Sequence, residues 1–308
     1  MRISRIVPSI ALAALTVSSL TAIPTQASTT TTIIAVGDIA RNVNGPQGKT
    51  AQLATALNPN YALLLGDLAY TAGSDNEFAT KFAPNWGTAI GAGHIPAIAV
   101  PGNHEYGTAN AAGYRNAAST YGFPTTGNDL WSVSQIGSWT VIGLDSEQLT
   151  DASNAKTLNA KGVREVAFLK SALATNNGRP TIVMWHRPRY STGQHGNQTD
   201  IGVTTLWKQS TADIDVKAVL WGHDHDFEPG IKTIAAAGGV AKHKVLIMTI
   251  GTGGAEPYKC KGSKCLTGSY GVVKMTLSAK KIKWEFHAAS ATVATGKILK
   301  KGTFAWTS

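Results

Sequence analysis

The 308-residue sequence contains only two cysteines, Cys260 and Cys265, which lie together in the segment CKGSKC and allow one disulfide at most. In an exported chain this pair is predicted to form a disulfide that closes a short surface loop without a catalytic role. Between about residues 32 and 306 the sequence also lacks a linker rich in proline and serine, a block of like charges and an internal repeat. These absences favour a single domain over residues 32–306.

The sequence contains one apolar stretch near its start, and nothing that resembles a second membrane span follows it. The apolar stretch near the start of the chain is shorter than the roughly 20 residues that a spanning helix needs. Arg2 and Arg5 precede this stretch, and the small residue Ala27 lies at its end in TQA. The pattern predicts a secretory signal peptide over residues 1–27 and a secreted protein, extracellular or associated with the cell wall, without a membrane span.

Acidic residues are fewer than basic ones, with 18 Asp and Glu against 28 Lys and Arg, a net charge of +10. Loss of residues 1–27 removes two arginines and no acids, so the chain remains clearly basic. A basic secreted protein attracts polyanions such as nucleic acid, cell-wall polymers or phosphorylated substrates, but the same charge also serves solubility. Because Trp207, Trp221 and Trp284 are interpreted as core or strand-face residues, no stable nucleic-acid partner is expected. The oligomeric state stays open.

Short apolar runs follow one another along the chain and are typical of strands buried on both faces. They cover residues 32–38, 61–67, 95–105, 139–146, 181–186, 216–225 and 244–254. Segments with helical spacing separate several of them, at residues 50–58, 76–87 and 162–177. The alternation predicts an α/β domain. The tail from residue 269 to 308 alternates like antiparallel strands, so a second sheet or a mixed edge is also expected.

Potential metal ligands follow most of these runs. They are Asp38, Asp67, Asn103, His186, His223 and His225. In open α/β sheets, ligands bind beyond the carboxyl ends of the strands, so these side chains are expected to converge. Each one alone has an ordinary explanation, such as a helix cap, a turn or a satisfied core histidine. The ordered set, which includes two histidines that point the same way in GHDH, favours a metal site.

Two cations about 3.5–4 Å apart require a bridging carboxylate and terminal ligands on each ion. The phenol of Tyr70, in GDLAY, completes such a set. A phenolate is hard and anionic, so a site with Asp38, Asp67, Tyr70 and His225 would favour Fe(III). A site with Asp67, Asn103, His186 and His223 would favour a divalent ion. The alternative for Tyr70 is a ring packed at a strand end with its hydroxyl group in water.

The ordered motifs GDIA, GDLAY, GNHEY, MWH and GHDH, between residues 37 and 225, resemble those of the calcineurin-like metallophosphoesterases. Tyr70 makes the chain similar to their purple acid phosphatase branch, in a short, single-domain secreted form. The resemblance implies an α/β fold, a four-layer α/β/β/α sandwich of two packed β-sheets flanked by helices. One departure is Ala40, where the family usually has glycine.

Residue by residue, the resemblance implies that Asp67 bridges two ions. It places Asp38, Tyr70 and His225 on Fe(III), and it places Asn103, His186 and His223 on a divalent Fe, Zn or Mn ion. His104 and His195 correspond to catalytic histidines that face the substrate and the leaving group.

The prediction is therefore a secreted, acid phosphatase-like enzyme that hydrolyses phosphomonoesters by attack of a metal-bound hydroxide on phosphorus. His104 would stabilise the phosphoryl oxygens or, with His195, protonate the leaving group. Arg187 is a candidate for phosphate binding, and Glu105 is a candidate for orienting His104. The alternatives are a phosphodiesterase or nucleotidase with the same metal site, and a non-catalytic polyanion-binding scaffold. Presence of the full ligand set favours catalysis.

Overall fold

The computed structural model describes residues 30–307, except residues 92, 152, 153, 291 and 293. The predicted signal peptide at residues 1–27 lies outside the described residues. No helix in the described part of the chain is long and apolar enough to span a membrane.

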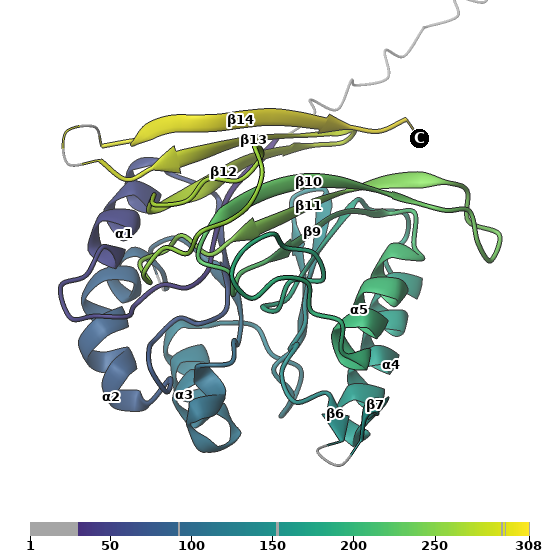
Figure 1. The fold of residues 1–308 in the computed structure, drawn as a ribbon, viewed down its shortest axis with the longest axis horizontal. Coiled ribbons are helices and arrows are strands. Elements are labelled where there is room, and N and C mark those ends of the chain that lie inside the picture. Colours follow the sequence, from purple (N-terminus) through teal and green to yellow (C-terminus); the bar gives the residue numbers. More distant parts are fainter. Residues whose placement is uncertain (1–29, 92, 152–153, 291, 293, 308) are drawn as a thin grey trace, which may run out of the picture.

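Two six-stranded sheets pack face to face in the centre of the molecule (Figure 1). The first sheet has the strand order β14-β13-β12-β1-β2-β3. Its strands are β1 (Thr31–Val36), β2 (Tyr61–Leu65), β3 (Ala97–Val100), β12 (Gly271–Ser278), β13 (Lys281–Ala288) and β14 (Lys297–Ala305). The first three strands pair in parallel, and β12 to β14 continue the sheet in antiparallel fashion, which makes it mixed.

The second sheet has the order β10-β11-β9-β8-β5-β4. Its strands are β4 (Ser132–Ile136), β5 (Trp139–Gly143), β8 (Thr181–Met184), β9 (Val216–Trp221), β10 (Phe227–Ile234) and β11 (His243–Ile250). The four central strands are parallel, and β4 and β10 form antiparallel edges. A separate small hairpin contains β6 (Thr150–Asp151) and β7 (Asn154–Leu158).

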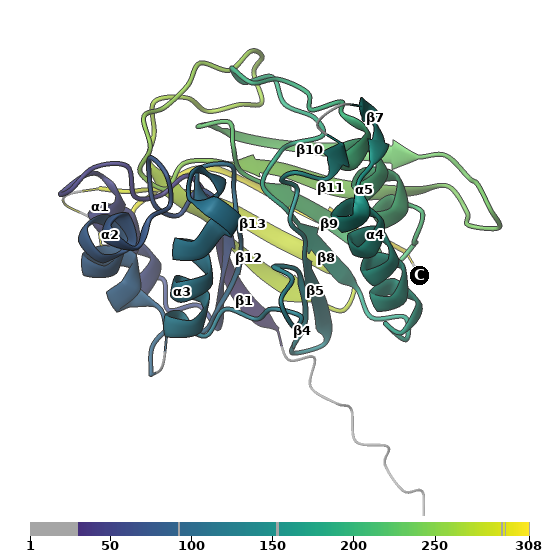
Figure 2. The same cartoon turned by 90° about the horizontal axis from the view of Figure 1, so that it is seen from below.

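Helices cover the outer faces of both sheets (Figure 2). On the first sheet these are α1 (Gln47–Ala56), α2 (Asp75–Glu77) with the π-helix η1 (Phe78–Gly87), and α3 (Ala112–Tyr121). On the second sheet they are α4 (Ala160–Ala174) and α5 (Ile201–Thr211). The short 3₁₀ turns η2 (Glu105–Gly107) and η3 (Ala109–Ala111) precede α3. The predicted α/β/β/α sandwich is confirmed.

The core consists of three apolar layers, which explains the continuous apolar runs. On β1, Ile33 and Ala35 face the second sheet, whereas Ile34 and Val36 face the helices. Because successive side chains of a strand point to opposite faces, a strand buried on both sides needs apolar residues at every position. All seven predicted strands are present, and so are the antiparallel strands of the tail. The segment at residues 76–87 is mainly a π-helix that contains Pro84, which has no N–H to donate.

Candidate metal centre

The predicted ligands lie in loops that leave the carboxyl ends of five parallel strands. Asp38 follows β1, Asp67 follows β2, Asn103 follows β3, His186 follows β8, and His223 follows β9. The backbone of Asp38, Asp67 and His223 is left-handed, with φ angles of 59°, 51° and 72°. Such conformations are costly for residues other than glycine, and they cluster at functional sites.

A glycine makes room for the central carboxylate. A Cβ atom on Gly102 would lie 2.2 Å from Asp67 Oδ1, so this position accepts no side chain. The polypeptide that leads to Asn103 therefore packs directly against Asp67, which brings the second and third strand ends together.

The first group of ligands surrounds the Tyr70 hydroxyl. Tyr70 Oη lies 2.9 Å from Asp38 Oδ1, 3.1 Å from Asp67 Oδ2 and 3.1 Å from His225 Nε2. His225 Nε2 is also 3.3 Å from Asp38 Oδ1. All four side chains are buried. The Tyr70 hydroxyl therefore points into the cluster of ligands and away from water, which contradicts the alternative of a solvent-facing phenol.

The second group surrounds His186 Nε2. This atom lies 3.3 Å from Asp67 Oδ2, 3.2 Å from Asn103 Oδ1 and 3.2 Å from His223 Nδ1. Ligand atoms of Asp67, His186 and His223 all lie within 4.8 Å of one another. Since Asp67 Oδ2 contacts both groups, the structure brings all seven predicted ligands together around one carboxylate.

Hydrogen bonds to carbonyl groups fix the orientation of two imidazoles. His186 Nδ1 donates to the carbonyl of Leu65 at 2.8 Å, and His225 Nδ1 donates to that of Glu256 at 2.6 Å. In the neutral rings, the Nε2 lone pairs therefore face the oxygen atoms of Asp67 and Asp38. Lone pairs and oxygens gather in this way around a cation, and carbonyl-oriented imidazoles are typical of metal-binding histidines. The donor set thus fits a pair of metal ions.

The pKa values show a surplus of negative charge at the centre. Burial lowers the pKa of His186, but the charge and hydrogen bond of Asp67 outweigh it and raise this pKa to about 10. Burial, Asp38 and Asp67 together raise the pKa of Tyr70 well above its usual value. His186 and Tyr70 therefore keep their protons at the position where cations would bind. Ionisation of the Tyr70 phenol needs a strong positive charge nearby.

Glu105 holds together two loops, the one that carries Asp67 and the one that carries Asn103. Its Oε1 accepts the backbone N–H groups of Leu68 and Ala69 at 2.8 and 3.2 Å. Its Oε2 accepts those of Asp67 and Gly102 at 2.9 and 2.7 Å. Burial and the charge of Asp67 raise the pKa of Glu105 to about 8, and the N–H groups of Gly102 and Ala69 oppose this rise.

The prediction that Glu105 orients His104 is therefore wrong, because both carboxyl oxygens of Glu105 bind backbone N–H groups. His104 Nδ1 instead donates to the carbonyl of Thr71 at 2.6 Å. The His104 ring stacks on Tyr70 with 4.2 Å between centroids, and its Nε2 lies 3.8 Å from Asp67 Oδ2. Its side chain is 30% exposed, so Nε2 stands at the mouth of the centre where a substrate can reach it.

His195 lies beside the predicted ligand His223. Its ring stacks on His223 with 4.2 Å between centroids, and its backbone N–H donates to Asp224 Oδ1 at 2.7 Å. Partial burial lowers the pKa of His195 against the opposing charge of Asp224. The structure thus brings both predicted catalytic histidines to the ligand cluster.

Arg187 borders a polar cavity beside the centre. Its Nε lies 2.9 Å from each carboxylate oxygen of the buried Glu147, and its NH1 lies 3.5 Å from His223 Nε2. The cavity has a volume of about 430 Å³, and its lining includes Asn103, Arg187 and Asp200. The structure therefore shows Arg187 next to the ligands, held by an acid that the motifs did not identify.

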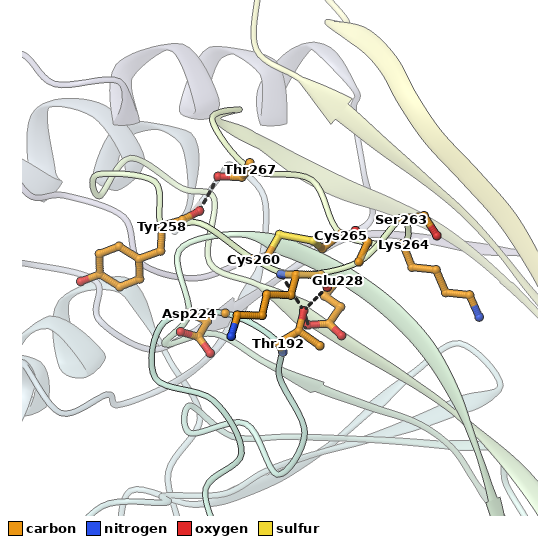
Figure 3. Close-up of a disulfide and its surroundings, with 12 residues drawn as sticks. Thr192, Asp224, Glu228, Tyr258, Cys260, Ser263, Lys264, Cys265 and Thr267 are labelled. Carbon is orange, nitrogen blue, oxygen red and sulfur yellow. Dashed lines mark hydrogen bonds between the residues drawn. A yellow bond between two sulfur atoms is a disulfide. The ribbon is translucent and has the colours of Figure 1, made fainter.

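Tyr258 is a second residue that sequence reasoning missed. Its ring lies flat on His225, with 3.9 Å between centroids and 12° between planes, and it meets His195 edge-on at 5.4 Å. It belongs to the loop that carries the disulfide between Cys260 and Cys265, which is present as predicted (Figure 3). A tyrosine in a loop without a motif gave no signal from which its role could be predicted.

Comparisons with known proteins agree with this geometry. A family model described as calcineurin-like phosphoesterase matches residues 31–227. The uncharacterized proteins Rv2577 and MT2654, from two strains of Mycobacterium tuberculosis, are each 25% identical over 206 residues. These residues cover 62% of this chain and 38% of each relative, so the chain spans well under two thirds of the length of the curated relatives it matches.

Solved structures share the fold at low sequence identity. Purple acid phosphatase PPD1 from yellow lupin seeds has a TM-score of 0.64 and 17% identity. The match covers 90% of this chain and 54% of the lupin chain. A dimetal phosphatase from Danio rerio has a TM-score of 0.59 and 12% identity, covering 90% and 99%. GAP50, described as the anchor in the inner membrane complex of Plasmodium, has a TM-score of 0.62 and 15% identity, covering 91% and 90%.

Proposed function

Because the chain belongs to the calcineurin-like phosphoesterase family, we propose that it hydrolyses phosphate monoesters with two metal ions held by the seven converging side chains. One observation carries the proposal: Asp67 Oδ2 lies 3.1 Å from Tyr70 Oη in one ligand group and 3.3 Å from His186 Nε2 in the other. A single carboxylate between two sets of terminal donors is the arrangement that a metal pair requires.

The ligand types support different ions at the two positions. Tyr70 adds an anionic phenolate to one group, which suits Fe(III), whereas Asn103 and two imidazoles suit a divalent Fe, Zn or Mn ion. When bound, such a pair supplies Lewis acidity for the phosphoryl oxygens and for a water molecule.

The chain's own residues supply binding and proton transfer. Arg187 is held through its Nε by Glu147 and its NH1 lies beside His223, so its NH2 group faces phosphate oxygens most readily. His104 has its Nδ1 occupied by the Thr71 carbonyl, so its Nε2 is the atom that hydrogen-bonds the substrate or gives a proton to the leaving oxygen. His195, stacked on His223, is the second candidate for that proton.

The fold alone does not establish catalysis, since an anchor protein and two phosphatases share it. The test is the hydrolysis of a chromogenic monoester and its diester analogue by purified protein, with metal content determined on the same sample. Monoester turnover with about two metals per chain, lost on strong chelation and restored by metal, would support the proposal. Diester preference would reassign the substrate, and a folded, metal-loaded protein with no turnover would refute the activity.

Variants separate the roles of the residues. Replacing His104 with alanine is expected to lower kcat by about 10²-fold or more at unchanged metal content. The matched control is His94→Ala, because His94 is an exposed histidine that precedes β3, whereas the predicted ligand Asn103 follows the other end of this strand. Arg187→Lys is expected to raise KM more than it lowers kcat, and an unchanged KM would remove Arg187 from substrate binding.

Secretion is part of the same proposal. The charged and apolar pattern of residues 1–27 supports it, and so does the disulfide between Cys260 and Cys265, which fits an oxidising compartment. N-terminal sequencing of the protein recovered from culture medium tests this, with a new terminus near residue 28 expected. Retention of the whole protein inside the cell with Met1 in place would contradict it.

A further inference from the structure

The net charge of the chain is concentrated in its last 52 residues. Residues 257–308 contain ten lysines, no arginine and a single acidic residue, Glu285, a net charge of +9. The remaining 256 residues contain 18 basic and 17 acidic residues and are therefore almost neutral. The excess positive charge of the protein therefore lies in residues 257–308, outside the motifs of the metal centre.

These lysines lie on β12 to β14, on the turn between β12 and β13, and on the disulfide loop. We call this set the lysine surface. It consists of Lys259, Lys261, Lys264, Lys274, Lys280, Lys281, Lys283, Lys297, Lys300 and Lys301.

Strand alternation directs several of these lysines to one face of the first sheet. Ile282 and Phe286 of β13 face the layer between the sheets, so Lys281 and Lys283 point to the opposite face. In the antiparallel register, Lys301 pairs with Glu285, which belongs to that same outward set. Lys281, Lys283 and Lys301 are all exposed, so no described element covers this part of the sheet.

The charge of the lysine surface is not neutralised by the protein itself. Among the described residues, no lysine of this surface forms an ion pair with a carboxylate, whereas Lys81 and Lys161 on other elements do. Glu285, the acid nearest in the register, pairs with His287 Nε2 at 3.2 Å. A group of cations without internal partners creates a positive field that attracts anions.

The disulfide loop, which carries Tyr258, Lys264 and the two cysteines (Figure 3), has contacts with both the metal centre and β14. Tyr258 stacks on His225 at the centre, and Lys259 is the next residue along the chain. At the other end, Lys300 Nζ on β14 donates to the carbonyls of Ser263 and Lys264 at 3.0 and 2.8 Å. The loop thus joins the edge of the sheet to the mouth of the centre.

We propose that the lysine surface docks a linear polymer that carries phosphate groups. Several point charges on one sheet face, with others on the adjoining turn, strand edge and loop, suit a repeated anion better than a single phosphate. Lysine binds phosphate as a point charge without the planar geometry of arginine, so the surface recognises charge density rather than a particular orientation.

Two other polyanions fit the surface less well. Single-stranded nucleic acid is bound by aromatic side chains on which bases stack, and the large aromatic side chains of β13 and β14, such as Phe286 and Phe304, face inward instead. An anionic membrane takes up apolar side chains, and the exposed large apolar residues of β12 to β14 are only Ile298 and Leu299. The proposed binding does not depend on the hydrolytic activity.

The test is fluorescence anisotropy with labelled long-chain inorganic polyphosphate over a series of salt concentrations. The surface variant carries Lys281→Gln, Lys283→Gln and Lys301→Gln. The control variant loses the same charge at exposed lysines on other elements, as Lys49→Gln, Lys170→Gln and Lys208→Gln. Circular dichroism and thermal melting show whether each variant is folded.

Wild type and the control variant are expected to bind alike, and the surface variant is expected to bind about tenfold more weakly or worse at low salt. The slope of log K against log salt should fall by about 2 in the surface variant, because about 0.7 counterions are released for each phosphate neutralised on a single strand. Equal losses in both variants, or no binding by wild type, would overturn the proposal.

Two parallel titrations test the identity of the polymer. Tighter binding of single-stranded DNA, or of vesicles that contain phosphatidylglycerol, through the same three lysines would refute a phosphate polymer as the occupant. Hydrolysis of the small monoester by the same samples should be equal in all three proteins. Failure of that activity leaves the anisotropy result unaffected, so the two proposals fail separately.

Discussion

Substitution of Glu105 by glutamine tests whether a buried carboxylate holds together the loops that carry Asp67 and Asn103. Each of its two oxygens accepts two backbone N–H groups, from Leu68 and Ala69 at one oxygen and from Asp67 and Gly102 at the other. Glutamine keeps one oxygen and places an NH₂ group where the other stood. Two of the four backbone N–H groups then face the NH₂ group of glutamine, another donor, and lose their acceptor in a buried site.

The expected loss follows from these contacts. A hydrogen bond to a charged group contributes about 1.5–3 kcal/mol, so the loss of two lowers the free energy of unfolding by about 3–6 kcal/mol. For a domain of this size each kcal/mol corresponds to about 2–4 °C, so the melting temperature should fall by roughly 10 °C. Scanning calorimetry of the two proteins measures this difference.

Glu228→Gln is the matched control. Glu228 accepts the N–H and the hydroxyl group of Thr192 through Oε2 alone, so glutamine can place its one oxygen there. A change of less than about 2 °C is expected for this variant. If Glu105→Gln is as stable as Glu228→Gln, the four N–H contacts do not hold the loops and the reasoning fails.

Three further predictions concern the metal, the pH and the disulfide. Tyr70→Phe should abolish the visible charge-transfer absorption of the Fe(III) form, and an unchanged spectrum with unchanged iron content would exclude Tyr70 as a ligand. Burial and Asp145 raise the pKa of Glu165 well above 4.5, so the unfolded chain loses this proton first and stability falls as the pH rises above about 4.5. Glu165→Gln should therefore become more stable relative to wild type in urea unfolding as the pH rises above about 5, and parallel pH profiles would count against this. Serine at both Cys260 and Cys265 should lower the free energy of unfolding by about 2 kcal/mol, whereas reduction of the double variant by dithiothreitol should change nothing more.

Several features of the fold followed from local pattern. The strands of both sheets were predictable because burial on two faces demands continuous apolar runs, as in the segment of β8. The segment at residues 76–87 was predicted as helical from its spacing, but spacing does not distinguish an α-helix from the π-helix that forms there.

The sequence by itself determined the ligand set, because Asp38, Asp67 and His186 follow apolar runs whose carboxyl ends meet at one edge of a sheet. It also determined the net charge and its concentration in residues 257–308. These properties depend on residue type and order, which a chain carries before it folds.

Only the tertiary structure decided how that set is supported. Glu105 binds N–H groups up to 38 positions away, and Arg187 meets Glu147 across 40 positions. Tyr258 reaches His225 from a loop whose path depends on the packing of two sheets. No periodicity or motif records such pairs, because they are set by the packing of separate elements, and the free energy of a hydrogen bond or a ring contact depends on a separation that exists only in the folded chain.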